Sequence, residues 1–195
     1  MSPAALLPIH CDFPRVYEVK VLESYPLVNP AEEFHQFPTR LEEGDRTGIY
    51  LRVMPKGAAP WVGFFAQGFA SDQVANGIYS CPAPQSICVA ASGYAYLVDA
   101  ANPQNWVQIE QRPVVEVRPI PALKLLLLVG FTTITALGTD GQLWTTERLS
   151  WEGLSIREVQ GNVLHGMGWD LMADKEVPFE LDLLTGISKG GARPR

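Results

Sequence analysis

The sequence predicts an all-β fold: one domain of short strands and tight turns, organised in degenerate repeats of about 37 residues. Composition is the first reason, because five Trp, six Tyr and eight Phe accompany 17 Gly and 16 Pro, which favours strands and turns over long helices. The second is a series of short β-rich runs, and the third is a recurring spacing of Pro and Gly-aromatic pairs. We expect a single mostly-β domain over residues 1–186, with the repeat region at about 60–185 and a flexible basic tail at 187–195.

The N-terminal part is predicted to contain one strand and one short helix. Residues 15–22 alternate apolar and polar side chains, which is typical of a strand with one solvated face. Residues 30–37 follow a capping Asn, begin with Pro and acidic residues, and precede Pro38, so they carry helix start and stop signals. Phe34 and Phe37, three residues apart, would share one face of this helix and dock it.

After a charged loop at 41–48, short β-rich runs follow one another to residue 183. The clearest local signal is Asp140-Gly141 between two such runs, because this pair favours the positive φ angles of a tight hairpin. The runs are 49–54, 62–66, 77–81, 87–91, 94–99, 106–109, 114–117, 123–129, 132–137, 143–146, 154–159, 163–168 and 177–183.

A repeat organises these runs. The doublets Pro82-x-Pro84 and Pro119-x-Pro121 are 37 residues apart. A Gly-aromatic pair follows each doublet, and the spacing between doublet and pair is the same in both copies. These pairs begin at Gly93 and Gly130, and a third begins 38 residues later at Gly168. A weaker pair, Gly63-Phe64, lies 30 residues before the first. If the units repeat, the three glycines are expected to occupy equivalent positions at strand ends.

A unit of nearly 40 residues with about four short strands resembles a blade of the β-propeller proteins. The resemblance rests on blade length and rhythm over residues 60–185, since neither the WD40 nor the kelch motif occurs. It implies a small propeller, or a partial one completed by a second chain; a β-sandwich or barrel is the alternative. The strand at 16–22 would close the seam of a monomer, and otherwise a homodimer would bury the open edges.

Charge and hydropathy narrow the expected partners and location. The formal net charge is −6, from 21 acidic and 15 basic residues, which disfavours nucleic acid and anionic membrane surfaces. The first ten residues lack a basic region and contain two prolines, so no secretory signal is expected. The longest apolar run, 123–131, contains Lys124 and is too short to span a bilayer. We expect a soluble, cytoplasmic protein whose partner is another protein, present as a monomer or homodimer.

Motifs for cofactors, metals and nucleophilic catalysis are absent from the sequence. No Gly-x-Ser-x-Gly elbow, phosphate-binding loop or dinucleotide fingerprint occurs. Cys11, Cys81 and Cys88 form an odd set without CxxC spacing, so we expect reduced, buried thiols rather than disulfides or a zinc site. No cofactor is expected.

The best candidate for chemistry is His165, which is followed within eleven residues by Asp170, Asp174 and Glu176. An imidazole oriented by a carboxylate can act as a general base, and His with carboxylates can bind a divalent metal. We therefore name His165, Asp170 and Glu176 as candidate catalytic residues. The favoured alternative is a hairpin turning at 173–175, with His165 held between strands.

Two functional hypotheses remain, from different classes. The favoured one is a non-catalytic intracellular scaffold that binds another protein, as an inhibitor, immunity-type factor or complex subunit. Trp151 and Trp169 are its candidate binding residues, because tryptophan concentrates contact area in one side chain. The alternative is a small hydrolase or metal-assisted enzyme centred on His165 and nearby carboxylates. The first is favoured because no catalytic constellation is complete.

Overall fold

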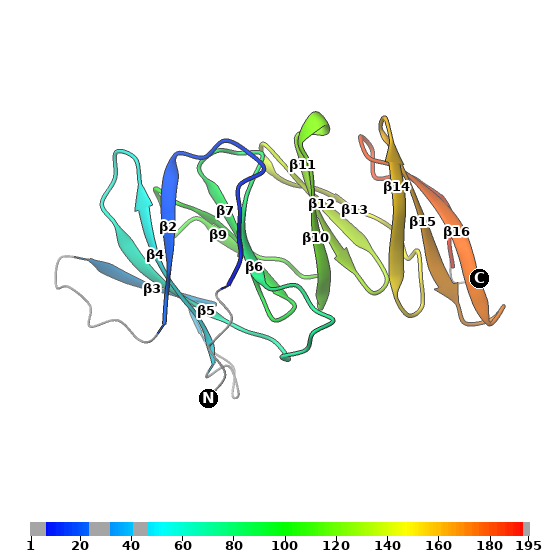
Figure 1. Cartoon of the computed structure of the whole chain (residues 1–195), viewed down its shortest axis with the longest axis horizontal. Helices are drawn as coiled ribbons and strands as arrows, with labels where there is room; N and C mark the ends of the chain where they lie inside the picture. Colours follow the sequence, from blue (N-terminus) through cyan, green and yellow to red (C-terminus); the bar gives the residue numbers. More distant parts are fainter. Residues whose placement is uncertain (1–6, 24–31, 41–46, 193–195) are drawn as a thin grey trace.

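The computed structural model describes residues 7–23, 32–40 and 47–192, and it is all-β. The strands of these residues form four sheets. Figure 1 shows them side by side in a row, coloured from blue at the N-terminal end to orange at the C-terminal end. In the described part of the chain the only helical element is a 3-10 turn, η1, at Pro121–Leu123.

The first and second sheets contain the strands up to residue 108. The first sheet has the order β2-β4-β5-β3 and the second the order β1-β6-β7-β8-β9. Most neighbours are antiparallel, but β3 runs parallel to β5 and β1 runs parallel to β6. The bounds are β1 Ile9–His10, β2 Tyr17–Leu22, β3 Glu33–Phe37, β4 Gly48–Pro55, β5 Trp61–Ala66, β6 Gly77–Ser80, β7 Ser86–Ala91, β8 Tyr94–Asp99 and β9 Trp106–Gln108.

The third and fourth sheets are simple antiparallel meanders, with the orders β10-β11-β12-β13 and β14-β15-β16-β17. Their bounds are β10 Val114–Ile120, β11 Leu125–Gly130, β12 Ile134–Gly138, β13 Gly141–Thr145, β14 Leu154–Gln160, β15 Val163–Asp170, β16 Lys175–Asp182 and β17 Ser188–Gly190. Apart from the two-residue strand β1, the second, third and fourth sheets begin with β6, β10 and β14, at residues 77, 114 and 154, which are 37 and 40 residues apart.

The helix expected near residues 30–37 is wrong. Residues 33–37 form the edge strand β3, and Phe37 pairs with Phe65 of β5. The Phe37 ring stacks on the Phe65 ring at 4.6 Å between centroids, whereas Phe34 lies on the other side of the strand and is exposed. Pairing with a buried aromatic strand therefore outweighs the local helix signals. Residues 30 and 31 of the expected helix lie outside the described residues.

Three hydrophobic clusters lie between consecutive sheets. The apolar strand β11 shows how alternation fills two of them: Leu126 and Leu128 pack toward the second sheet, while Leu127 and Val129 pack toward the fourth. None of the three clusters joins the first sheet to the fourth within the described part of the chain. The predicted strand at 16–22 does form, as β2, but it lies at the edge of the first sheet beside β4 instead of closing a seam.

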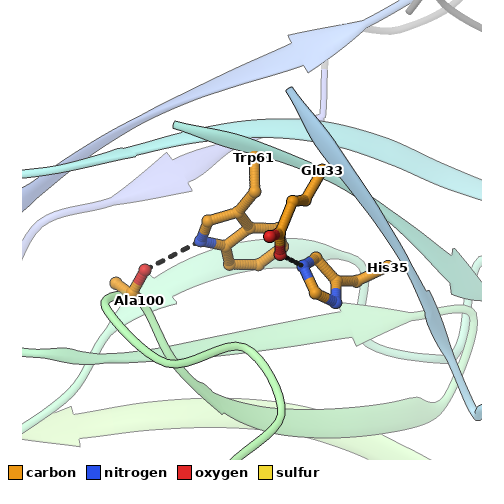
Figure 2. A network of polar contacts seen from close by, with 4 residues as sticks. All are labelled: Glu33, His35, Trp61 and Ala100. Atoms are coloured by element: carbon orange, nitrogen blue, oxygen red, sulfur yellow. Dashed lines mark hydrogen bonds and ion pairs between the residues drawn. The ribbon is translucent and has the colours of Figure 1, made fainter. Parts of the chain in front are cut away.

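Two buried hydrogen bonds and one partly buried hydrogen bond join the first sheet to the second. Trp61 Nε1 donates to the Ala100 carbonyl at 2.8 Å, as Figure 2 shows. Tyr96 Oη donates to the Ala66 carbonyl at 2.8 Å, and Tyr17 Oη donates to the Ser86 carbonyl at 3.0 Å. These bonds pair carbonyl groups that the sheet stacking removes from water, so they fix the relative position of the two sheets.

The glycines of the predicted repeat are only partly equivalent. Gly130 and Gly168 each pair with the first residue of the first strand in their sheet. Gly93 instead lies in the β7–β8 turn, where its φ of +83° suits glycine. At Gly168 the reason for glycine is space, because a Cβ there would lie 2.2 Å from the Leu149 carbonyl oxygen.

Two further local predictions can be compared with the structure. The hairpin at Asp140-Gly141 is confirmed: Gly138 pairs with Gly141, and Gly141 has a φ of +100°. The tail predicted to be flexible from residue 187 instead contains β17, and Ala192 is buried and donates its N–H to the Leu149 carbonyl. Residues 193–195 lie outside the described residues.

Candidate functional site

The structure separates the candidate catalytic residues. His165 lies on β15 opposite Glu180 of β16, and its Nδ1 is 3.9 Å from Glu180 Oε1. Asp170 lies five residues further along the strand, so it faces the opposite side and its Cα is about 16 Å away at the usual rise per residue. Glu176 pairs with Trp169, and its Oε2 is 3.5 Å from Arg157 Nη2. His165, Asp170 and Glu176 therefore do not converge.

The carboxylate of Asp170 has a local structural role. Its Oδ1 accepts the backbone N–H groups of Met172 and Ala173, at 2.9 and 3.3 Å, and so orders the β15–β16 turn. Asp174 ends that turn with a φ of +49°, a conformation that Asp tolerates better than most residues. The predicted turn at 173–175 thus exists, as the four-residue connection 171–174. Within the described ranges no group of three or more His, Cys, Asp or Glu could hold a metal ion.

A groove of about 740 Å³ lies at one edge of the sheets, among turns and inter-sheet segments. We call this side of the molecule the turn edge: it carries the β7–β8, β11–β12 and β15–β16 turns and the segments 67–76, 109–113 and 147–153. These turns point downward in Figure 1. The groove is lined by Gln73, Glu110, Gln111, Arg112, Pro113, Phe131, Thr132, Thr133, Trp151, Glu152, Gly153 and Leu171.

Backbone hydrogen bonds build the turn edge by tying each turn to a segment that enters a sheet. The N–H of Val114 donates to the Gly93 carbonyl at 2.8 Å, and that of Gly153 donates to the Phe131 carbonyl at 3.1 Å. The N–H of Trp151 donates to the Trp169 carbonyl at 2.9 Å. The groove therefore rests on a hydrogen-bonded frame rather than on free loops.

The two tryptophans proposed for binding have different places at this edge. Trp151 lines the groove, and the guanidinium carbon of Arg148 lies 4.5 Å from the centre of its ring. Trp169 contributes its backbone: its N–H donates to Ser150 Oγ at 2.8 Å, and its carbonyl accepts the N–H of Trp151. Trp151 is therefore placed to contact a ligand in the groove, whereas Trp169 lies on β15 and helps to hold the Trp151 segment.

A polar cluster forms the side of the groove next to β12. Gln111 Nε2 donates to the Leu128 carbonyl at 2.9 Å, and its Oε1 accepts the hydroxyls of Thr133 and Thr135 at 3.1 and 3.0 Å. Arg112 places its guanidinium carbon 4.8 Å from the centre of the Tyr94 ring. With aromatic, amide and charged groups around an open hollow, the site can hold a mixed polar and apolar partner surface.

Exposed apolar side chains on the turn edge were missed by sequence reasoning. Leu171 and Phe131 line the groove and are exposed. Met172, next to Leu171, is 80% exposed, and Phe69, in segment 67–76, is 87% exposed. Phe69 reaches this edge because the N–H of Gly68 donates to the Ala91 carbonyl at the end of β7. The available sequence signal was Leu171-Met172, two large apolar residues placed directly before the predicted turn.

Another feature missed in the sequence is a contact between Glu33 and His35 on β3. Two residues apart on a strand, they share a face, and His35 Nε2 lies 3.2 Å from Glu33 Oε2. The His35 ring packs edge-on against Trp61 at 5.6 Å between centroids, next to the Trp61–Ala100 hydrogen bond (Figure 2). The arrangement orders β3 against β5 and the Trp61 ring.

The cysteine prediction is wrong for one of the three residues. All are free thiols, but Cys11 is exposed while Cys81 and Cys88 are buried between the second and third sheets. Burial raises the pKa of Cys88 to about 12, and burial likewise raises the pKa of Cys81. The two buried thiols are therefore protonated packing groups at neutral pH.

No helix among the residues placed by the structure is long and apolar enough to cross a membrane. Comparison with protein-family models finds none that matches the chain, and comparison with curated proteins likewise finds no match.

Proposed function

We propose that this protein is a non-catalytic scaffold that binds another protein through its turn edge. The observation that carries the proposal is a groove lined by Trp151 and by the exposed Phe131 and Leu171. The exposed Met172, next to Leu171 in the β15–β16 turn, and Phe69 of segment 67–76 add apolar surface to the same turn edge. Apolar side chains that surround a hollow with a polar rim are typical of protein-binding surfaces. Aromatic anchors such as Trp151 commonly supply much of the binding energy.

The architecture supports this proposal. We infer that the four sheets are propeller-type units arranged in an open row, in which each sheet packs on its neighbours and presents its turns along a common edge. The backbone bonds from Val114, Trp151 and Gly153 hold that edge in place before binding, which reduces the entropy lost on association. The net charge of −6 favours a protein partner over nucleic acid.

No observation comparable to the groove supports the enzyme hypothesis. A general base at His165 would need a carboxylate to orient it and a cavity for substrate. Glu180 Oε1 lies 3.9 Å from His165 Nδ1, and Asp170 lies on the opposite face of the strand. The scaffold is therefore the function that the geometry supports better.

The test compares two turns of matched construction. Met172 follows Asp170 by two residues and donates its N–H to Asp170 Oδ1 at 2.9 Å; Leu184 follows Asp182 by two and donates to Asp182 Oδ1 at 2.8 Å. Both side chains are exposed, 80% and 62%, but Leu184 lies in the β16–β17 turn at the opposite edge.

Tagged wild-type protein, Met172→Asp and Leu184→Asp are expressed in the native cell, cross-linked, and purified for quantitative mass spectrometry. A partner retained by wild type and Leu184→Asp should fall about ten-fold or more with Met172→Asp, as expected for loss of an apolar anchor. Equal melting temperatures of the two variants exclude misfolding as the cause. Identical captured proteins for all three, or no captured partner, would contradict the proposal.

A further inference from the structure

The second and third sheets each end in an exposed edge strand, and the two strands line a common groove. β9 is the last strand of the second sheet and β13 the last of the third, so each has one side without a strand neighbour in its sheet as far as the structure describes them. Val107 of β9 and Leu143 of β13 are both half exposed. Edge strands of this kind are templates for an added strand.

Two adjoining cavities lie beside β13 and share two lining residues. The first, of about 440 Å³, is lined by Trp106 and Val107 from β9 and by Gly141 and Gln142 from β13. The second, of about 460 Å³, shares Ile109 and Gln142 with the first and extends to Thr145 at the end of β13. Together they contact Gly141, Gln142 and Thr145 of β13, and we call these two adjoining cavities the edge-strand groove.

The edge-strand groove continues into the turn edge. Its second cavity shares Glu110, Gln111 and Thr133 with the larger groove beside Trp151. A segment bound along β13 would therefore reach the surface that we propose as the main binding site. One partner chain could engage both surfaces at once.

The chemistry of the edge-strand groove suits a polar, positively charged segment. Its lining carries the carboxylates of Asp99, Asp140 and Glu110, and neither of its two cavities is lined by Lys or Arg. The remaining lining is rich in Thr, Gln and Asn, which donate and accept hydrogen bonds. In a groove of one charge sign, charge complementarity selects the partner.

We propose that the edge-strand groove binds an extended segment of the partner protein that carries Lys or Arg at alternate positions and adds to β13 as a further strand. This inference rests on the proposed scaffold function and names the kind of segment that the partner supplies. Main-chain hydrogen bonds to the β13 edge give the affinity, and alternate side chains reach the carboxylates. A five-residue strand such as β13 pairs with about 17 Å of extended chain.

The probe is a displayed library of random ten-residue peptides, selected on the immobilised full chain. Enriched peptides should carry Lys or Arg at alternate positions and lack internal Pro, which cannot donate to a strand ladder. The most enriched peptide, synthesised with a fluorescein label, is then used for anisotropy titrations and for hydrogen exchange. Binding should slow amide exchange in residues 141–145.

Charge-neutralised variants test the role of the groove itself. Asp140→Asn combined with Glu110→Gln should weaken binding of the selected peptide about three- to ten-fold, and the loss should shrink at high salt. Glu18→Gln combined with Glu158→Gln changes the net charge equally on the exposed surfaces of the first and fourth sheets. This control pair should leave peptide binding unchanged.

Several outcomes would overturn the inference: no enriched peptide, enriched peptides without basic residues, exchange protection away from β13, or equal losses in both variant pairs. Its failure can be distinguished from failure of the proposed function. If capture of a cellular partner depends on Met172 but not on Asp140 and Glu110, the scaffold function stands and the edge-strand groove is not its site.

Discussion

Removing one buried hydroxyl should measure how firmly the first two sheets are joined. Tyr96 is fully buried, donates to the Ala66 carbonyl at 2.8 Å, and accepts from Gln108 Nε2 at 3.3 Å. Tyr96→Phe keeps the ring and removes only the hydroxyl, so the Ala66 carbonyl remains buried without this donor. Leaving such a group unpaired costs about 1–3 kcal/mol of unfolding free energy. For a chain of 195 residues, this corresponds to a fall of roughly 2–12 °C in Tm.

The assay is urea denaturation of wild type and Tyr96→Phe, followed by tryptophan fluorescence and circular dichroism. Leu184→Ala is the control, because an exposed truncation in a turn should change the unfolding free energy by no more than about 0.5 kcal/mol. Hydrogen exchange should rise most in β5 and β8, the strands that the bond joins. A loss for Tyr96→Phe no larger than that of the control would show that this bond does not hold the sheets together.

Three further results are expected. Gly168→Ala should lower the free energy of unfolding by about 3 kcal/mol or more, because its Cβ would lie 2.2 Å from the Leu149 carbonyl oxygen. Gly161→Ala, in open space at a φ of +61°, should lower it by only about 1–2 kcal/mol. Denaturant titration of the two variants compares these losses. Iodoacetamide should label Cys11 in the folded protein and the two buried thiols only after unfolding, as peptide mass spectrometry can show. Burial raises the pKa of Cys88 to about 12 from an unfolded value of about 8.5. The contribution of the protonated thiol to the free energy of unfolding is therefore complete below about pH 8.5 and is lost as pH rises toward 12. Urea titrations under reducing conditions should show that the free energy of unfolding falls by up to about 1.4 kcal/mol per pH unit more in wild type than in Cys88→Ala.

Local sequence signals were sufficient where neighbouring residues decide the structure. Asp140-Gly141 fixes a hairpin because glycine takes the positive φ that the turn needs. The strands β10 to β16 were predicted from short β-rich runs that are separated by connections of a few residues. The same signals failed at β3, where acidic and proline residues suggest a helix but a buried strand distant in sequence supplies the pairing partner.

The candidate site was less predictable than the fold. Trp151 was named as a binding residue and lines the groove, but the groove itself combines turns from different sheets. His165 and its acidic neighbours are close in sequence, yet an extended strand spreads them along its length and over both faces. The exposed Phe69, before the second sheet, and Met172, in a turn of the fourth, belong to the same edge of the molecule because the sheets stack in a row, a relation that no local pattern contains.

By itself the sequence determined that the chain is all-β, that its strands are short, and where its tight turns lie, since these depend on side-chain period and on the φ preferences of Gly, Asn and Asp. Only the tertiary structure decided which strands pair, that β2 lies beside β4 rather than at a seam, and that Cys11 is exposed while Cys88 is buried. It also decided which side chains surround the grooves. The physical reason is that pairing and stacking join residues tens of positions apart through burial of apolar surface, which depends on the whole chain and not on neighbouring residues.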